Sequence, residues 1–371
     1  MADNTPIEWA DATVNAINGC SILSPGCIHC YAMRLAGGRL RRHPSRTGLT
    51  IGSKAGPVWN GTVRLHEPAL LQPLRWRRPR TIFWNAHGDT FHEAVPVEWI
   101  DRMFAAMAAT PRHQHLVLTK RTARMRQYVS DLPSRVHADF GGWEGFEDTW
   151  LNGIPHRTAD IWPLPNVWLG TSVEDQRRAD ERIPDLLATP AAGRFLSCEP
   201  LLGPIDLMSL TLPTCTDKFD ALQGMGWGLL PAHHGGDRLY HGATKSRYGK
   251  IDGVIVGGES GPGARPMHPD WARQIRDDCA SADVDFHFKQ WGVHTPLRSD
   301  LIPVARRNIG WMQRDGRVEY GVCGDALDAM AEAEQKADRN LLTMTCRVGK
   351  KAAGRTLDDR THDALPWRRT I

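Results

Sequence analysis

The sequence predicts an α/β fold, a partial (β/α) barrel of about six to seven parallel strands, on three observations. Short apolar runs alternate with helical segments of about 10 to 15 residues, which is typical of βαβ units. Each run ends in polar or charged residues, as strands do where their carboxyl ends meet at a barrel rim. Including the apolar run before Cys20, the sequence has about seven expected strands, one fewer than a complete barrel of eight. A partial, open barrel therefore fits the pattern as well as a closed one.

Apolar runs in chain order are the expected strands, and segments with apolar residues at helical spacing are the expected helices. The strands are residues 13–17, 81–84, 115–118, 167–170, 194–197, 254–256 and 285–288. The helices are residues 97–107, 122–129, 175–187 and 269–280. Residues 35–75 are rich in Gly, Arg and Pro, and they predict an extended connection without regular secondary structure.

Two long segments interrupt this alternation, and a third follows it. Residues 134–163 and 211–252 are expected to be loop insertions that leave the rim as lids or substrate contacts. Residues 1–299 would form the barrel with its N-terminal cysteine loop, and residues 300–371 a C-terminal appendage that packs on it. The appendage has a hairpin turn signal at Asp315-Gly316.

The composition is that of an ordinary globular protein and excludes a membrane-spanning class. The 371 residues carry 46 basic and 42 acidic side chains, so the net charge of +4 creates no strong overall field. No apolar run is long enough to span a membrane, and the N-terminus lacks the basic start and apolar core of a signal peptide. We therefore expect a cytoplasmic protein without a membrane partner, in a compartment that keeps thiols reduced.

Three cysteines lie close together near the N-terminus, and they are the strongest chemical signal in the chain. Cys20, Cys27 and Cys30 are separated by six and then two residues, and Pro25-Gly26 in the longer gap predicts a loop. A loop can direct three thiolates toward one point, as a metal ion or an iron–sulfur cluster requires. A disulfide or a reactive pair with one stray cysteine is the alternative interpretation.

Polar residues follow the expected strands in series, and carboxylates alternate with ammonium groups. The carboxyl ends of parallel strands meet at one rim, where active sites are built, so these residues are the candidates for substrate contact and catalysis. The charged ones are Asp89, Lys120, Glu174, Glu199, Glu259 and Lys289. The uncharged or neutral candidates, which we expect nearer a cofactor, are Asn85, His87 and Ser172.

Several short motifs, spread over most of the chain, together suggest a family. They are Ile7-Glu-Trp-Ala-Asp11, Asn18-Gly-Cys20, Ser24-Pro-Gly-Cys27, Cys30-Tyr-Ala, Leu118-Thr-Lys-Arg121, Leu169-Gly-Thr-Ser-Val-Glu-Asp175, Glu199-Pro-Leu-Leu-Gly-Pro-Ile-Asp206, Gly257-Gly-Glu-Ser-Gly261, Phe288-Lys-Gln-Trp-Gly292 and Gly349-Lys-Lys-Ala-Ala-Gly-Arg355. With these motifs the chain resembles a phage and bacterial family of unknown function that carries the three-cysteine motif and is regarded as radical-SAM-like. Such proteins are often encoded beside a partner protein named for the three-cysteine motif.

The resemblance implies a radical S-adenosylmethionine enzyme that carries a [4Fe–4S] cluster on Cys20, Cys27 and Cys30. Three thiolates leave one iron open, and in radical enzymes this iron chelates S-adenosylmethionine, whose one-electron reduction yields a 5′-deoxyadenosyl radical. An electron donor is then a required partner. Cys27-Ile-His-Cys30 resembles half of the radical-enzyme signature with His29 in its aromatic place, so His29 and the following Tyr31 are expected to lie by the cofactor.

The substrate expected from these features is a nucleic-acid base or a nucleotide. Basic segments at 39–43, 75–80 and 350–355, tryptophans in apparent loops, and the phage setting of the resembling family favour it. Solvated basic faces and tryptophans in core contacts are the alternative interpretation of the same residues.

Two other functions fit the sequence. In one, the cysteines hold a structural zinc ion with His29 or His43 as the fourth ligand, in an adaptor or nucleic-acid-binding protein without radical chemistry. In the other, the rim carboxylates serve a metal-dependent hydrolase and the cysteines are only structural.

Overall fold

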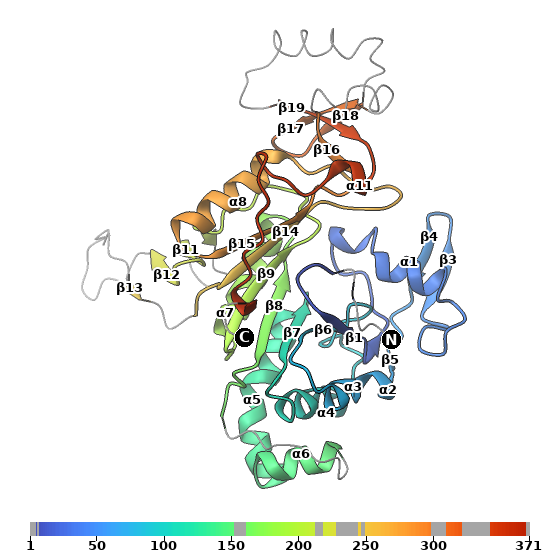
Figure 1. The fold of residues 1–371 in the computed structure, drawn as a ribbon, viewed down its shortest axis with the longest axis vertical. Helices are drawn as coiled ribbons and strands as arrows, with labels where there is room; N and C mark the ends of the chain where they lie inside the picture. Colours follow the sequence, from blue (N-terminus) through green and yellow to red (C-terminus); the bar gives the residue numbers. More distant parts are fainter. Residues whose placement is uncertain are drawn as a thin grey trace, which may run out of the picture.

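A seven-stranded parallel sheet forms the centre of the protein, seen here in a computed structural model (Figure 1). The structure describes residues 5, 7–151, 161–211, 218–227, 244–245, 249–297, 309–320 and 342–368. The strands lie side by side in chain order, and every neighbouring pair is parallel. They are β1 (Ala12–Val14), β6 (Thr81–Trp84), β7 (Gln114–Thr119), β8 (Val167–Ser172), β9 (Gly193–Cys198), β14 (Gly253–Gly257) and β15 (Asp285–Gln290). The predicted half-barrel of parallel strands is therefore confirmed.

The first strand is shorter than the sequence pattern predicts. Residues 13–17 were expected to form one strand, but β1 ends at Val14, and Ile17–Asn18 form β2, which pairs antiparallel with β5 (Arg64–Leu65). The chain leaves the sheet because the Ile17 N–H donates a 2.8 Å hydrogen bond to the side-chain oxygen of Asn85, not to a neighbouring strand. This departure directs the cysteine loop outward over the rim.

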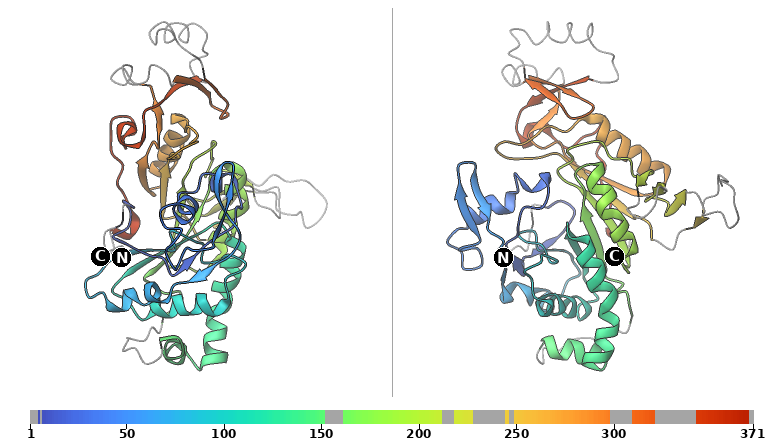
Figure 2. Two further views of the ribbon diagram at one scale, coloured as in Figure 1. Left: turned by 90° about the vertical axis from the view of Figure 1, so that its right-hand side faces the viewer. Right: turned by 180° about the vertical axis from the view of Figure 1, so that it is seen from behind.

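Helices cover one face of the sheet, and in Figure 2 (right) α5, α7 and α8 lie in front of it. They are α4 (Val97–Ala108), α5 (Thr122–Phe140), α7 (Gln176–Ala188) and α8 (Pro269–Ser281). The helix expected to end near residue 129 continues to Phe140 because Leu132 and Val136 extend its buried face. It stops before Gly141, whose φ of 71° suits a glycine. The first predicted loop insertion, 134–163, therefore contains the end of α5 and also α6 (Trp143–Leu151).

Residues 35–75 contain regular structure, contrary to the prediction of an extended connection. The elements are the end of α1 (Tyr31–Gly37), β3 (Thr50–Ser53), β4 (Gly56–Trp59), β5, α2 (Glu67–Leu70) and α3 (Gln72–Arg75). Each is too short to show a clear period in the sequence. They are stabilised by a small core of their own, in which Met33, Leu49 and Trp59 are buried together.

The two faces of the sheet bury different partners, as the alternation of side chains along a strand requires. Val254 and Val256 belong to the core under the helices, whereas Ile255 faces the concave side and packs with Phe195 and Trp367. On the concave side the lower half of the barrel is thus filled with apolar and aromatic side chains. The polar site can lie only above them, toward the carboxyl ends of the strands.

The C-terminal segment crosses the gap between the two edges of the open sheet. Within residues 361–368, one contact is with β15, where the Phe288 N–H donates to the carbonyl of His362. Its last contacts are with the segment before β1, where the Trp367 indole donates a 3.1 Å hydrogen bond to the Trp9 carbonyl. Because Trp367 is fully buried, this segment closes the half-barrel at the amino ends of the strands.

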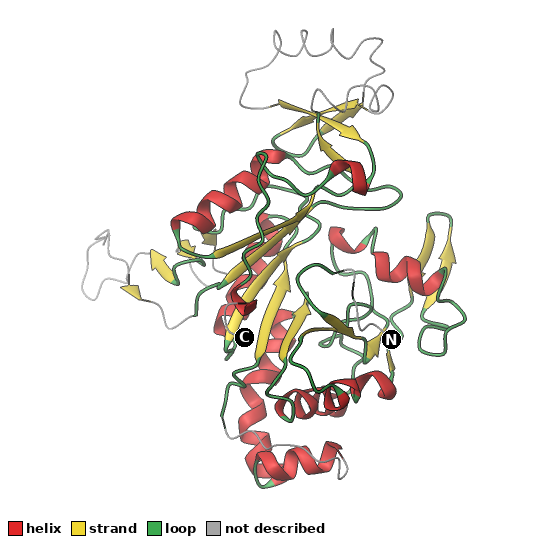
Figure 3. Ribbon diagram, in the orientation of Figure 1, coloured by secondary structure: helices red, strands yellow, loops and turns green. Residues whose placement is uncertain are grey.

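Besides the pair of β2 and β5, three smaller sheets within the described residues stand outside the barrel (Figure 3). One is the hairpin of β3 and β4. The second belongs to the insertion 211–252 and consists of β10 (Leu210–Thr211), β11 (Lys218–Asp220), β12 (Met225–Trp227) and β13 (Thr244–Lys245). Residues 212–217, 228–243 and 246–248 of this insertion lie outside the described residues. The third consists of β16 (His294–Pro296), β17 (Ile309–Gln313), β18 (Val318–Tyr320) and β19 (Leu342–Arg347). The hairpin predicted at Asp315-Gly316 joins β17 to β18 and is confirmed. No helix within the described residues is long and apolar enough to cross a membrane.

Candidate functional site

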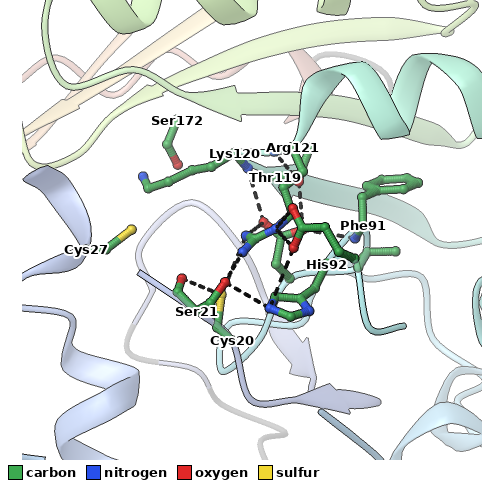
Figure 4. A network of polar contacts seen from close by, with 12 residues as sticks. Cys20, Ser21, Cys27, Phe91, His92, Thr119, Lys120, Arg121 and Ser172 are labelled. Carbon is green, nitrogen blue, oxygen red and sulfur yellow. Dashed lines mark hydrogen bonds and ion pairs between the residues drawn. The ribbon is translucent and has the colours of Figure 1, made fainter. Parts of the chain in front are cut away.

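The cysteine loop lies over the carboxyl ends of the strands, and charged side chains from the rim hold it there. Figure 4 shows Cys20 and Ser21 beside Arg121, with Lys120 and Ser172 on the side where Cys27 lies. Three separate sets of contacts connect the loop to the rim, and they come from the segments after β7, β8 and β14. We call these the first, second and third anchors.

The first anchor is Arg121, which follows β7. Its guanidinium donates to Ser21 Oγ at 2.7 Å and lies 3.6 Å from the Cys20 sulfur. Asp89 and Glu93 balance its charge at 3.1 and 2.9 Å. These two carboxylates together outweigh the effect of burial and raise the pKa of Arg121, so the guanidinium stays charged.

Asp89 was predicted to contact the substrate, but its carboxylate instead accepts hydrogen bonds from the residues around this anchor. Its carboxylate accepts from Thr119 Oγ1 at 2.6 Å and from the backbone N–H groups of Phe91 and Lys120 at 2.9 and 3.2 Å, besides the ion pair with Arg121. A carboxylate with four donors is fixed in place. Asp89 therefore positions the loop and its own arginine.

The second anchor is Glu174, which follows β8 and has no solvent exposure. Its carboxylate accepts a hydrogen bond from Ser24 Oγ, pairs with Arg182 at 2.7 Å and lies 3.6 Å from the Lys120 ammonium group. Burial opposes ionisation, but the two cations prevail and lower its pKa. Gly26 is required here, because a Cβ at this residue would lie 2.6 Å from the Glu174 side chain.

The third anchor is the ion pair of Glu259 and Arg265, in the segment after β14. Arg265 donates to both carboxylate oxygens, at 2.6 and 2.9 Å, and to the Pro25 carbonyl of the cysteine loop at 3.0 Å. Nearby, the Arg34 guanidinium donates to the Pro262 carbonyl at 2.5 Å. The loop that begins at one edge of the sheet is therefore held by the sixth strand along.

Glu199 and Lys289 form the one predicted rim pair that does not touch the cysteine loop. The Lys289 ammonium lies 2.8 Å from Glu199, and both side chains keep some solvent exposure. The alternation of β15 places Lys289 on the concave face with His287, because Phe286 and Phe288 belong to the core under the helices. Of the six predicted charged residues, this pair is the best placed to meet a substrate from inside the barrel.

The three cysteines lie in one loop but are not gathered as ligands of a single ion. No group of three or more His, Cys, Asp or Glu side chains in the described part of the chain is arranged to hold a metal ion. The charge of a Cys27 thiolate would raise the pKa of both Cys20 and Cys30, so Cys27 lies near each of them. Burial and Asp89 raise the pKa of Cys20 to about 12, and burial raises that of Cys30.

These residues fit an iron–sulfur cluster in their chemistry and their setting. Thiolates are the usual protein ligands of such clusters, and a cluster of several iron atoms spans more space than one ion. A thiol with a high pKa stays protonated at neutral pH unless a metal holds its thiolate. The cradle is also built closely, because a Cβ on Gly26 would meet Glu174 and one on Gly263 would lie 2.9 Å from His29. Cys20, Cys27 and Cys30 are the residues that would hold the cluster.

The residues predicted to contact a cofactor have different surroundings. Asn85 is buried with a φ of 58°, and its amide contacts the Ile17 N–H and Thr90 Oγ1, so it shapes the base of the loop. The other four predicted residues also contact protein groups. The rings of His87 and His29 lie 2.6 Å from Arg46 and 3.1 Å from Arg34. The Tyr31 hydroxyl donates to the Ala86 carbonyl at 2.8 Å, and the Ser172 carbonyl accepts from Arg182 at 2.8 Å.

Sequence reasoning missed the arginines that hold the loop. Arg121 and Arg265 each pair with a predicted carboxylate and also contact the loop, but an arginine in a polar segment is usually a solvated residue. The signal that could have found Arg121 is its position directly after Lys120, within a motif that carries the family resemblance.

The fold and the rim define an α/β half-barrel protein whose N-terminal cysteine loop is fixed across the carboxyl ends of its strands. The chain belongs to the family described as "Protein of unknown function (DUF5131)", which matches residues 4–366. No curated protein and no solved structure matches the sequence.

Proposed function

We propose that this protein is an iron–sulfur enzyme of the radical S-adenosylmethionine type, with a [4Fe–4S] cluster held by Cys20, Cys27 and Cys30. The observation that carries the proposal is the fixing of the three-cysteine loop at the carboxyl-end rim of a parallel half-barrel. Active sites of barrels lie at this rim. When bound, the cluster and S-adenosylmethionine would supply one-electron reduction and a 5′-deoxyadenosyl radical.

The chain's own residues have three tasks in this proposal. The three anchors hold the cysteine loop, and their buried ion pairs keep its shape without taking part in the reaction. The aromatic filling under Trp367 excludes water from the lower half of the barrel. Glu199 and Lys289, which are paired but still partly exposed, would bind polar groups of the substrate from the concave face.

A nucleic-acid base or a nucleotide is the proposed substrate, and the basic segments support it. Arg39, Arg41 and Arg42 are exposed, as are Arg77 and Arg78. The insertion tryptophans give less support than expected. Trp143 is buried and stacks on Trp162 with ring centroids 5.5 Å apart, so these rings pack against each other. Binding to a polyanion should weaken steeply as salt rises, and binding that changes little would count against this substrate class.

The test begins with anaerobic purification and analysis of iron and sulfide. Protein with a reconstituted cluster, given a reductant and S-adenosylmethionine, should form 5′-deoxyadenosine. Cys20→Ala, Cys27→Ala and Cys30→Ala should each lose iron and this activity. Cys279→Ala, which changes a buried cysteine in α8 outside the loop, is the matched control and should keep both.

Three outcomes would overturn the proposal. A colourless protein with stoichiometric zinc and no iron would favour the structural-zinc function. An intact cluster that yields no 5′-deoxyadenosine, with or without nucleotides, would exclude radical chemistry. Activity that survives Cys30→Ala and is lost in Glu199→Gln would favour the metal-dependent hydrolase.

A further inference from the structure

Arg46 is a buried arginine beside the cysteine loop with an unusual set of partners. Arg46 is only 7% exposed, and its guanidinium donates to Ser45 Oγ at 2.6 Å and to His87 Nδ1 at 2.6 Å. Its Nε atom is buried and has no hydrogen-bond partner. We call Arg46, Ser45, His43 and His87 the Arg46 cluster.

No carboxylate pairs with Arg46 among the described residues, which distinguishes it from the other buried arginines of the site. Arg121 pairs with Asp89 and Glu93, and Arg182 pairs with Glu174. Burial lowers the pKa of Arg46 to about 10, so the guanidinium remains charged at neutral pH. A buried charge without a counter-ion is costly, and proteins rarely keep one without a ligand or a partner.

The Arg46 cluster lies where the two ends of the cysteine loop come together. The His87 carbonyl accepts a 3.1 Å hydrogen bond from the N–H of Gly19, which precedes Cys20. The His87 ring also packs edge-on against Tyr31, which follows Cys30, with ring centroids 6.1 Å apart. A group bound at Arg46 would therefore lie next to the proposed cluster site.

Within the Arg46 cluster, the guanidinium is the hydrogen-bond donor to both Ser45 and His87. An arginine can only donate, so His87 Nδ1 accepts from it and the proton of the neutral imidazole is on Nε2. Burial and Arg46 lower the pKa of His87 to about 4, which keeps this ring neutral. Ser45 Oγ accepts from Arg46 and is 2.7 Å from Nδ1 of the exposed His43, so the contacts continue from the buried guanidinium to the surface.

We propose that Arg46, with His87 and His43, forms a binding site for an oxyanion, a phosphate or a carboxylate group. The Nε–H of Arg46 has no hydrogen-bond partner, and a guanidinium without a carboxylate counter-ion matches the oxygen atoms of such a group. Two sources could supply such oxygen atoms: the phosphate of a nucleotide substrate and the carboxylate of S-adenosylmethionine. The use of this site by an enzyme rests on the proposed function, whereas the binding of an oxyanion does not.

Arg46→Met separates this role from a purely structural one. Methionine fills similar space without a charge, and the buried cation of the wild type lacks a counter-ion. The Arg46→Met variant should therefore melt at a higher temperature than the wild type when no anion is present. The matched control is Arg177→Met, which removes the same charge from an exposed position on α7, outside the basic segments and the cysteine loop. It should leave the melting temperature and anion binding almost unchanged.

The binding experiment titrates anaerobically purified protein with inorganic phosphate and, separately, with S-adenosylmethionine, by calorimetry and by thermal shift. If phosphate is the ligand, Arg46→Met should weaken its binding about 10- to 100-fold, as expected for loss of a charged hydrogen bond, and abolish the thermal shift it causes. If the carboxylate is the ligand, only the affinity for S-adenosylmethionine should fall by that factor.

Two results would overturn the proposal. One is an Arg46→Met protein that melts below the wild type without anions, since the arginine would then be a structural residue. The other is unchanged affinity for both ligands. Arg46→Gln, which keeps polar contacts to Ser45 and His87, is titrated as a second variant and should show the same loss of affinity. Neither result depends on 5′-deoxyadenosine formation, so this proposal can fail while the proposed function stands.

Discussion

Glu174→Gln should lower the free energy of unfolding by about 3 kcal/mol, because it leaves two cations without their buried partner. Breaking a buried ion pair by removing one member costs about 3–5 kcal/mol. We take the lower end because Lys120 is partly exposed and because Arg182 keeps its 2.8 Å hydrogen bond to the Ser172 carbonyl. The amide has nearly the volume of the carboxylate, so packing around Gly26 is preserved.

The expected change in melting temperature follows from the length of the chain. At about 2.1 cal/mol/K per residue, the unfolding entropy of 371 residues is about 0.8 kcal/mol/K, and the loss corresponds to about 4 °C. Differential scanning calorimetry at neutral pH measures it. Glu181→Gln, which breaks the exposed pair with Arg177, is the control and should change the melting temperature little.

The same variant predicts a dependence on pH. The pKa of Glu174 in the folded protein lies below its ordinary value of 4.5, so the carboxylate contributes its full stability above pH 4.5. That contribution is lost as the pH falls through the folded-state pKa. The difference in melting temperature between the wild type and Glu174→Gln should therefore be largest at neutral pH and should shrink toward zero in acid. Equal melting temperatures for Glu174→Gln and Glu181→Gln at neutral pH would refute the reasoning.

Three other substitutions test further contacts. Gly26→Ala should reduce the iron content after reconstitution, measured colorimetrically, because its Cβ would displace the loop from Glu174. Glu259→Gln frees Arg265 from its carboxylate, and iron release to a chelator should become severalfold faster, measured by absorbance. Trp367→Ala should lower the free energy of unfolding in urea by about 3–5 kcal/mol, because the indole is fully buried.

Each of these predictions has a control and an opposing result. Gly52→Ala adds a Cβ where no atom lies within 4 Å, so it should keep the iron content, and equal iron in both glycine variants would contradict the argument. Asp358→Asn breaks pairs on α8 away from the loop, and a matching increase in iron release there would remove the special role of the third anchor. Trp367→Phe should cost less than the alanine variant, and a urea midpoint unchanged in both would show that the segment does not close the barrel.

The strands and the charged rim could be predicted because both depend on local sequence. A buried parallel strand is a continuous apolar run, and the run 81–84 has the bounds of β6. Glu174 and Glu199 stand out because each comes within four residues of the end of such a run. What could not be predicted is pairing over long distances in the chain, such as Glu199 with Lys289 at 2.8 Å.

The arginines show most clearly why the rest of the site could not be found. Arg46 lies next to an exposed basic segment, and nothing in the letters around it indicates that this one guanidinium is buried. Its environment is created by short elements between residues 35 and 75, whose periods are too brief to detect. The radical-SAM resemblance and the substrate class stay predictions, because they concern chemistry that the fold alone does not specify.

The contact between Trp9 and Trp367 has a consequence for how the protein is made. These residues are 358 positions apart, so Trp9 is synthesised long before its partner Trp367. At about 5–20 residues per second, translation leaves Trp9 without this partner for roughly 20 to 70 s. Until then the apolar concave face of the nascent sheet lacks this cover, and we expect chaperones to bind the growing chain until the segment with Trp367 emerges from the ribosome.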